Sequence, residues 1–144
     1  MKADDTRRFV LDASVAVAWC FEDESTKFTE SVLRLLEEGA EALVPSIWPL
    51  EIANALLVAE RRRRIALARA TALLQQIAGL PISVLPIDAK QAFEQILSVA
   101  RQQSLSEYDA AYLDLALRRG LPLATLDGEM RRSAKATGVA LVPA

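Results

Sequence analysis

Short apolar runs alternate along the chain with longer segments of helical periodicity, and this alternation limits the folds that the chain can adopt. Each run is too short for a helix and is typical of a buried strand. These runs span residues 9–11, 42–44, 81–85, 121–125 and 140–142. The segments between them predict helices at 14–19, 26–38, 47–63, 67–78, 89–102, 107–119 and 128–137. Strands that alternate with helices predict an α/β fold whose mainly parallel sheet is covered on both faces.

Capping residues support these helix boundaries. Ser46, Asp88 and Ser106 each precede a helical segment and are good N-cap residues. Gly39 and Gly120 each follow one, where glycine commonly ends a helix. The gap between the third and fourth helices is short and suggests a helical hairpin.

The length and composition predict one globular domain. The chain has 144 residues, of which 52% are hydrophobic and 25% charged. We expect residues 1–7 to be a loose end and residues 8–143 to form the domain. The net charge of −2 provides no overall attraction for nucleic acid, so RNA binding would need a local basic patch.

The N-terminal region predicts a cytoplasmic protein without a membrane span. The apolar stretch that follows residue 8 is interrupted by Asp12 and ends at Glu22, too short and too acidic for a span or signal peptide. The single Cys20 cannot form an internal disulfide, which indicates a reducing compartment.

Four carboxylates stand where acidic residues are least expected, in a chain that has no histidine. Asp12 and Asp127 each follow a predicted strand, Glu51 interrupts an apolar helix, and Asp109 lies at the start of another helix. Acids after parallel strands share one edge of the sheet, where functional crevices occur. If all four converge, their mutual repulsion calls for a cation.

Each acid also has a purely structural interpretation. Asp12 and Asp127 are suitable caps for the helices that follow them. Asp109 lies three residues after Ser106 and suits the acidic half of a capping box. Glu51 is exposed if the apolar face of its helix has a gap. Capping cannot explain Glu51, so it carries the most weight for a shared site.

The sequence around the four acids resembles the PIN-domain pattern, most closely that of the VapC-like ribonuclease toxins of bacterial toxin–antitoxin pairs. The motifs that carry the resemblance are VLDAS at 10–14, PSIWPLEIAN at 45–54, YDAAYLDLA at 108–116 and ATLD at 124–127. The resemblance covers about residues 8–143 and implies a three-layer α/β/α sandwich with a twisted sheet. It also implies a metal-dependent endoribonuclease that hydrolyses RNA phosphodiester bonds and is bound by a cognate antitoxin. Cys20 and the run 61–64 of four arginines lie outside the pattern.

The resemblance assigns catalytic roles to Asp12, Glu51, Asp109 and Asp127. Hard carboxylate oxygens suit Mg²⁺ or Mn²⁺, and we expect Asp12, Asp109 and Asp127 to be the direct ligands. Glu51 would bind a second ion or orient the attacking water. The hydroxyl-bearing residues that match the pattern are Ser14 and Thr125, which would hydrogen-bond the carboxylates.

Several basic and aromatic residues have two interpretations. The arginines at 61–64, 118–119 and 131–132, together with Lys135, are suitable phosphate contacts, but charge runs usually mark a solvated face. Tyr108 and Tyr112 suit base stacking, although core packing also explains Tyr112. Trp48 suits the core or an interface.

The apolar hairpin 52–78 contains more leucines than one layer over a sheet needs, which indicates a homodimer or a partner helix. The alternative function is a non-catalytic α/β interaction domain whose acids are only caps. A haloacid-dehalogenase fold is disfavoured, because Ser14 stands where that family needs a second aspartate. A receiver-type fold is disfavoured, because the acidic pair that it needs is not evident.

Overall fold

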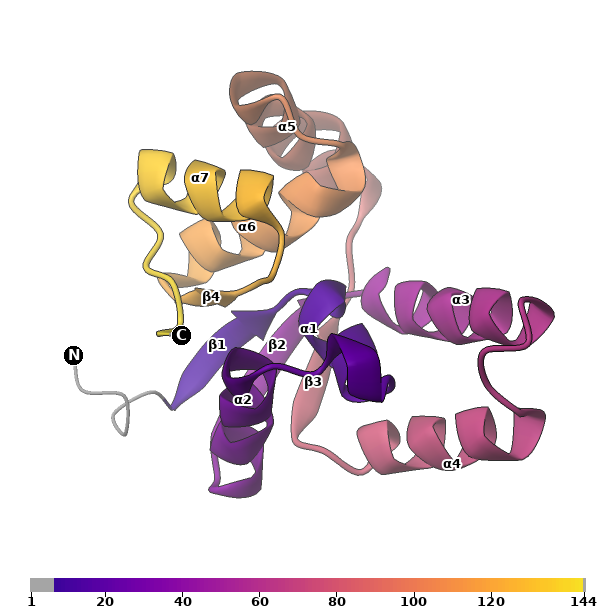
Figure 1. Cartoon of the computed structure of the whole chain (residues 1–144). Coiled ribbons are helices and arrows are strands. Elements are labelled where there is room, and N and C mark those ends of the chain that lie inside the picture. The colour runs from indigo at the N-terminus through magenta and orange to yellow at the C-terminus, as the bar shows by residue number, and fades with distance from the viewer. Residues whose placement is uncertain (1–6, 144) are drawn as a thin grey trace.

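The protein is an α/β fold in which helices flank a parallel sheet (Figure 1), as the sequence predicts. The computed structural model describes residues 7–143. In that part of the chain the strands are β1 (Arg8–Leu11), β2 (Glu41–Pro45), β3 (Ile82–Leu85) and β4 (Leu123–Ala124), in the order β3-β2-β1-β4. The expected loose end at 1–7 lies outside the described residues, apart from Arg7.

The helices cover both faces of this sheet. Their bounds are α1 (Ala13–Trp19), α2 (Lys27–Glu37), α3 (Trp48–Arg61), α4 (Leu67–Ala78), α5 (Leu97–Gln103), α6 (Glu107–Arg119) and α7 (Gly128–Thr137), with a 3₁₀ turn at Glu22–Glu24. Figure 1 shows α6 and α7 on one side of the strands and α1 and α2 on the other. The three-layer arrangement predicted from the sequence is therefore present.

The strand order creates a switch point beside β1. The chain moves from β1 outwards to β2 and β3, then returns to place β4 on the other side of β1. Leu11 is paired with Ala124, so the two strands end together. The backbone N–H of Asp12 donates to the carbonyl of Ala124 at 3.0 Å and extends this contact beyond the strands. In parallel sheets, the crevice beyond the carboxyl ends of strands at a switch point is the usual functional site.

Helix α6 crosses β1, β2 and β4 and is buried on most of its surface. Its residues from Ala110 to Ala116 are all buried, because the sheet covers one side and neighbouring helices cover the others. Asp114 is buried within this run, where its Oδ2 accepts a 2.8 Å hydrogen bond from Arg118 Nε. This packing fixes the N-terminal turn of α6 at the carboxyl edge of the sheet.

The strand prediction was too long at the C-terminal end of the chain. The predicted strand 121–125 is reduced to Leu123–Ala124, because Pro122 has no N–H and the chain turns into α7 soon afterwards. The predicted strand 140–142 is a single bridge between Leu141 and Leu123.

Two helix starts also differ from the prediction. Ser46 is not a cap: helix α3 begins at Trp48 with Ile47 as its N-cap residue, because Pro49 is accommodated only in the first turn. Asp88 is a cap, since its Oδ1 accepts from the N–H of Gln91 at 2.8 Å. The helix that follows opens with a π-helical segment at Gln91–Ile96, which the apolar periodicity did not reveal.

In the described part of the chain, no helix has both the length and the apolar character that a membrane crossing needs.

Candidate active site

Asp12 lies at the carboxyl end of β1 and is held by two hydroxyl groups. Its side chain is only 6% exposed. Ser14 Oγ donates to Asp12 Oδ2 at 2.7 Å, and Thr125 Oγ1 donates to the same oxygen at 2.8 Å. Asp12 occupies the N-cap position of α1, but its side chain makes no capping hydrogen bond. The capping interpretation therefore fails for Asp12, and the hydroxyls of Ser14 in α1 and of Thr125, directly after β4, orient its carboxylate instead.

Asp127 follows β4 and caps α7 with one of its oxygens. Asp127 Oδ1 accepts from the N–H of Glu129 at 2.8 Å and from the N–H of Met130 at 3.2 Å. The backbone N–H of Asp127 itself donates to Thr125 Oγ1 at 3.1 Å. Thr125 thus connects Asp127 to Asp12. The capping bonds use Oδ1 and leave Oδ2 available to a ligand.

Asp109 lies in the first turn of α6, one layer above the strand ends. Ser106 caps this helix, and its Oγ accepts from the N–H of Asp109 at 3.1 Å. The reciprocal bond of a capping box, from the Ser106 N–H to the Asp109 carboxylate, is not part of this cap. The half-buried carboxylate of Asp109 is therefore placed by the helix start and is not consumed by capping.

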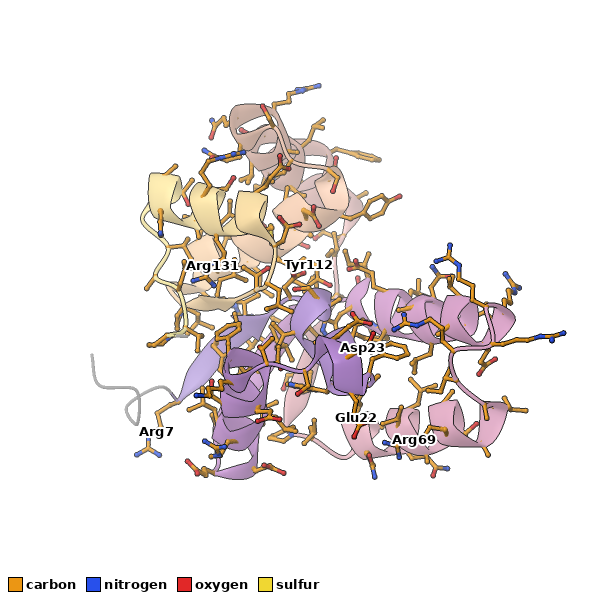
Figure 2. The ribbon with its side chains drawn as sticks, viewed as in Figure 1. Arg7, Glu22, Asp23, Arg69, Tyr112 and Arg131 are labelled. Atoms are coloured by element: carbon orange, nitrogen blue, oxygen red, sulfur yellow. The ribbon has the colours of Figure 1, made fainter. Side chains whose placement is uncertain are left out.

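Glu51 lies in the first turn of α3 and is tied to α6 by a tyrosine. The hydroxyl of Tyr112 donates to Glu51 Oε1 at 2.5 Å and links the two helices (Figure 2). Tyr112 is fully buried, whereas Glu51 is half-buried. Glu51 is therefore not exposed through a gap, and Tyr112 belongs to the core and is not free to stack on a base.

The four carboxylates interact electrostatically with one another. Burial raises the pKa of Asp12, and the charge of Asp127 raises it further against the lowering effect of Ser14 and Thr125. Burial and then the charges of Asp12 and Asp127 raise the pKa of Asp109.

Glu51 belongs to the same electrostatic group. Burial raises its pKa, the hydrogen bond from Tyr112 lowers it, and the charges of Asp12 and Asp109 raise it. The structure thus brings the acids close enough for neighbouring negative charge to raise the pKa of Asp12, Glu51 and Asp109, and a cation at this edge would relieve the repulsion.

The donor set fits a hard divalent cation, although the carboxylates do not close around one point. Among residues 7–143, no group of three or more acidic, histidine or cysteine side chains is arranged to hold a metal ion. Mg²⁺ is usually held by one or two carboxylates together with several waters. A pair of these acids is therefore enough for binding, and the three-ligand assignment to Asp12, Asp109 and Asp127 remains a prediction.

Four of the basic residues proposed for phosphate contact already make contacts within the protein. They are Arg64, Arg118, Arg131 and Arg132, and the last pairs with Glu129 at 3.9 Å. Arg131 Nη1 donates to the Thr125 carbonyl at 3.0 Å, and its guanidinium lies 5.8 Å from the ring centre of Phe28 (Figure 2). Arg118 is paired with Asp114. Arg131 therefore supports the loop that carries Thr125.

Arg64, from the run of four arginines, joins the α3–α4 hairpin to the segment after α1. Its Nη2 lies 3.2 Å from Glu24 Oε2 and 3.4 Å from Asp23 Oδ2. Its guanidinium lies 4.4 Å from the ring centre of Phe21. Arg64 thus has a structural role at this end of the molecule.

Sequence reasoning missed the pairing of Tyr112 with Glu51. Tyr112 shares a helical face with Ala116 and Leu113 in a strongly apolar segment, and this pattern predicts a core residue. The one available signal is that a buried tyrosine hydroxyl needs a hydrogen-bond partner, and that Glu51, an acid between apolar residues of its helix, needs a donor.

Comparison with known proteins gives one matching family and a consistent fold. The family model described as "PIN domain" matches residues 9–136. Curated proteins give no match.

Solved structures with a similar fold cover nearly the whole chain. PAE2754 from Pyrobaculum aerophilum is 23% identical with a TM-score of 0.72, and the match covers 96% of this chain and 92% of that one. VapBC2 from Rickettsia felis, bound to a DNA fragment from its promoter, is 14% identical with a TM-score of 0.64, covering 93% and 96%. A toxin–antitoxin complex from Klebsiella pneumoniae is 13% identical with a TM-score of 0.58, covering 83% and 86%. At these identities the likeness shows the fold.

Proposed function

Because the chain belongs to the PIN-domain family, we propose that it is a metal-dependent endoribonuclease and the toxin of a toxin–antitoxin pair. The observation that carries this proposal is the acidic cluster at the switch point of the sheet. Asp12, Glu51, Asp109 and Asp127 come from four separate segments, and three of them have a pKa raised by burial and by one another's charges. Such a cluster is costly for the fold, so it indicates a function.

A bound Mg²⁺ or Mn²⁺ would offset the negative charge of the phosphodiester and make a bound water more acidic. The acids proposed to hold the ion are Asp12, Asp109 and Asp127. Ser14 and Thr125 keep the Asp12 carboxylate in one orientation, and the capping bonds of Asp127 do the same for that side chain. This preorganisation lowers the reorganisation needed when substrate arrives.

Glu51 is the acid best placed to act on the attacking water. Burial raises its pKa, which brings a carboxylate closer to the range in which it accepts and returns a proton at neutral pH. The Tyr112 hydroxyl holds Oε1 and leaves Oε2 to accept a hydrogen bond from the water. Glu51 therefore orients the water and takes its proton in the proposed reaction.

Asp109→Asn tests this assignment. We expect the variant to lose cleavage of a labelled RNA in Mg²⁺ or Mn²⁺ while its melting temperature without metal is no lower than that of the wild type. Glu37→Gln is the matched control, because it removes one negative charge from an exposed position on α2 and should leave cleavage intact. Cleavage by wild-type protein that persists in a chelator, or full activity of Asp109→Asn, would contradict the proposal. A chain that cleaves no RNA and is not stabilised by divalent ions would instead be the non-catalytic interaction domain.

A protein partner belongs to the same proposal. The complex from Klebsiella pneumoniae is a toxin–antitoxin complex of similar fold, which supports a cognate antitoxin in the cytoplasm. On the α3–α4 hairpin, Leu56 and Leu73 are buried in the core, whereas Leu57 and Leu74 are 40% and 36% exposed. The hairpin therefore retains apolar surface for an antitoxin or a second copy.

A pocket beside this hairpin adds to that surface. It has a volume of about 320 Å³ between α3, α4 and β3, and Trp48, Leu74 and Val84 line it. Trp48 Nε1 is buried without a hydrogen-bond partner among residues 7–143. Analytical ultracentrifugation of the chain alone and with its genomic neighbour separates a homodimer from an antitoxin complex.

A further inference from the structure

Large apolar side chains are exposed directly beside three of the four acids. Leu50 precedes Glu51 and is 72% exposed, Tyr108 precedes Asp109 and is 66% exposed, and Leu126 precedes Asp127 and is 41% exposed. Single exposed apolar residues are common on protein surfaces, but here three of them directly precede an acid of the same proposed site, which is a pattern. These residues, here called the apolar rim, each immediately precede one of the acids in the sequence.

Tyr108 is the aromatic member of the apolar rim, and its placement follows from Tyr112. The two tyrosines are four residues apart on α6 and lie on the same face of the helix. Tyr112 reaches Glu51 from this face, so Tyr108 lies one turn nearer the open N-terminal end of α6. Helical side chains lean towards the N-terminus, which carries the ring of Tyr108 towards solvent above the acids.

The charge distribution leaves little long-range attraction for RNA. The chain has a net charge of −2, and the acids of the site repel a phosphodiester. The guanidinium of Arg131 is held by the Thr125 carbonyl. Contacts with bases add affinity that does not depend on the charge of the protein, and aromatic rings provide such contacts without dependence on sequence.

We propose that Tyr108 is a substrate-binding residue that stacks on an unpaired nucleobase next to the phosphodiester held at the acids. This inference rests on the proposed ribonuclease function and adds a binding residue to it, because an unpaired base can offer its face to the ring. Leu50 and Leu126 provide apolar contacts on either side of the acids. Double-stranded RNA presents phosphates and hydroxyls at its surface and gains nothing from Tyr108.

The test compares Tyr108→Ala and Tyr108→Phe with the control Phe93→Ala. Phe93 is also an exposed aromatic, at 74%, but it lies on a segment that carries none of the four acids. Fluorescence anisotropy with a labelled, unstructured RNA oligomer, with Ca²⁺ replacing Mg²⁺, measures affinity. We expect Tyr108→Ala to weaken binding roughly 5- to 150-fold, the range that corresponds to loss of one stacked base. Tyr108→Phe keeps the ring and should bind as wild type does.

A second measurement separates binding from chemistry. In Mg²⁺, Tyr108→Ala should raise KM for the single strand and leave kcat near the wild-type value. The same oligomer annealed to its complement should bind weakly, and equally to wild type and variant.

Other outcomes would overturn the inference. Unchanged RNA affinity in Tyr108→Ala would do so, as would an equal loss in Phe93→Ala. A Tyr108→Ala variant that keeps its RNA affinity but releases its co-expressed antitoxin would place Tyr108 in a protein interface instead. The anisotropy arm does not depend on cleavage. A chain that binds unpaired RNA through Tyr108 yet cleaves none would therefore retain this inference and lose the proposed function.

Discussion

Tyr112→Phe removes one oxygen atom and with it the hydrogen bond that joins α6 to Glu51. Tyr112 is 0% exposed, and its hydroxyl lies 2.5 Å from Glu51 Oε1. A hydrogen bond to a charged acceptor contributes about 1.5–3 kcal/mol to the free energy of unfolding. Because Glu51 is half-buried, water replaces part of this bond, and we expect the variant to lose about 1.5–2 kcal/mol at neutral pH. For a domain of this size, that corresponds to a fall in Tm of roughly 3–8 °C.

The loss should depend on pH, because the acceptor titrates. The Tyr112 hydroxyl lowers the pKa of Glu51, whereas burial and the charges of Asp12 and Asp109 raise it. In the variant the pKa of folded Glu51 rises further above its unfolded value of about 4.5. Over the interval between these two values the folded state binds more protons than the unfolded state, so stability falls as pH rises. The difference between variant and wild type should therefore be smallest below about pH 4.5 and largest at neutral pH.

Urea unfolding at a series of pH values measures this difference. Tyr108→Phe is the control, because it makes the same chemical change at a residue that is 66% exposed and should alter stability little. Glu51→Gln combined with Tyr112→Phe closes a double-mutant cycle that isolates the pair. A gap that is the same at all pH values, or additive effects in the double variant, would refute the role assigned to the Tyr112–Glu51 bond.

Two further predictions concern charge. Asp12→Asn should raise Tm at neutral pH without metal, because burial and the charge of Asp127 raise the pKa of Asp12 and so make the ionised form unfavourable in the folded state. Below about pH 3.8 Asp12 is protonated in both the folded and the unfolded state, so a pH series of thermal melts should show the gain disappear there. Arg64→Ala should lower the free energy of unfolding in urea by about 1 kcal/mol, since it removes two exposed ion pairs and a cation–π contact with Phe21. If high salt does not reduce this loss, the ion pairs contribute little to it.

The parts of the fold that were predictable from sequence are those set by local chemistry. Helices at 67–78, 107–119 and 128–137 match the structure at both ends. Gly120 and Gly138 adopt positive φ at two of these ends, a conformation that glycine adopts without strain. Asp88 and Ser106 cap their helices through bonds that span three residues. In each case the residue that determines a helix end lies within one helical turn of that end.

The parts that sequence reasoning missed depend on distant residues. The bond from Tyr112 to Glu51 joins positions 61 apart, and no sequence pattern indicated it. The bond from Thr125 to Asp12 joins positions 113 apart and was expected only from the family resemblance. The strand order determines which carboxylate oxygen remains free. It also determines whether Arg131 faces solvent or the Thr125 carbonyl. No local pattern encodes that order. The resemblance therefore named Ser14 and Thr125 as partners of the carboxylates, but not Tyr112 as the partner of Glu51.

At this site an acidic residue can both start a helix and belong to the proposed metal site, so the two interpretations of the acids do not exclude each other. Every one of the four acids lies at an N-cap or in the first turn of a helix: Asp12 on α1, Glu51 on α3, Asp109 on α6 and Asp127 on α7. The partial positive charge of a helix N-terminus stabilises a nearby carboxylate by about 0.3–1 kcal/mol. Four such termini meet at one sheet edge and offset part of the mutual repulsion in a chain without histidine. Asp127 performs both roles at once, since Oδ1 caps α7 and Oδ2 remains available. A helix start is thus a position at which this fold can hold an acid with a free carboxylate oxygen, as the proposed metal site requires.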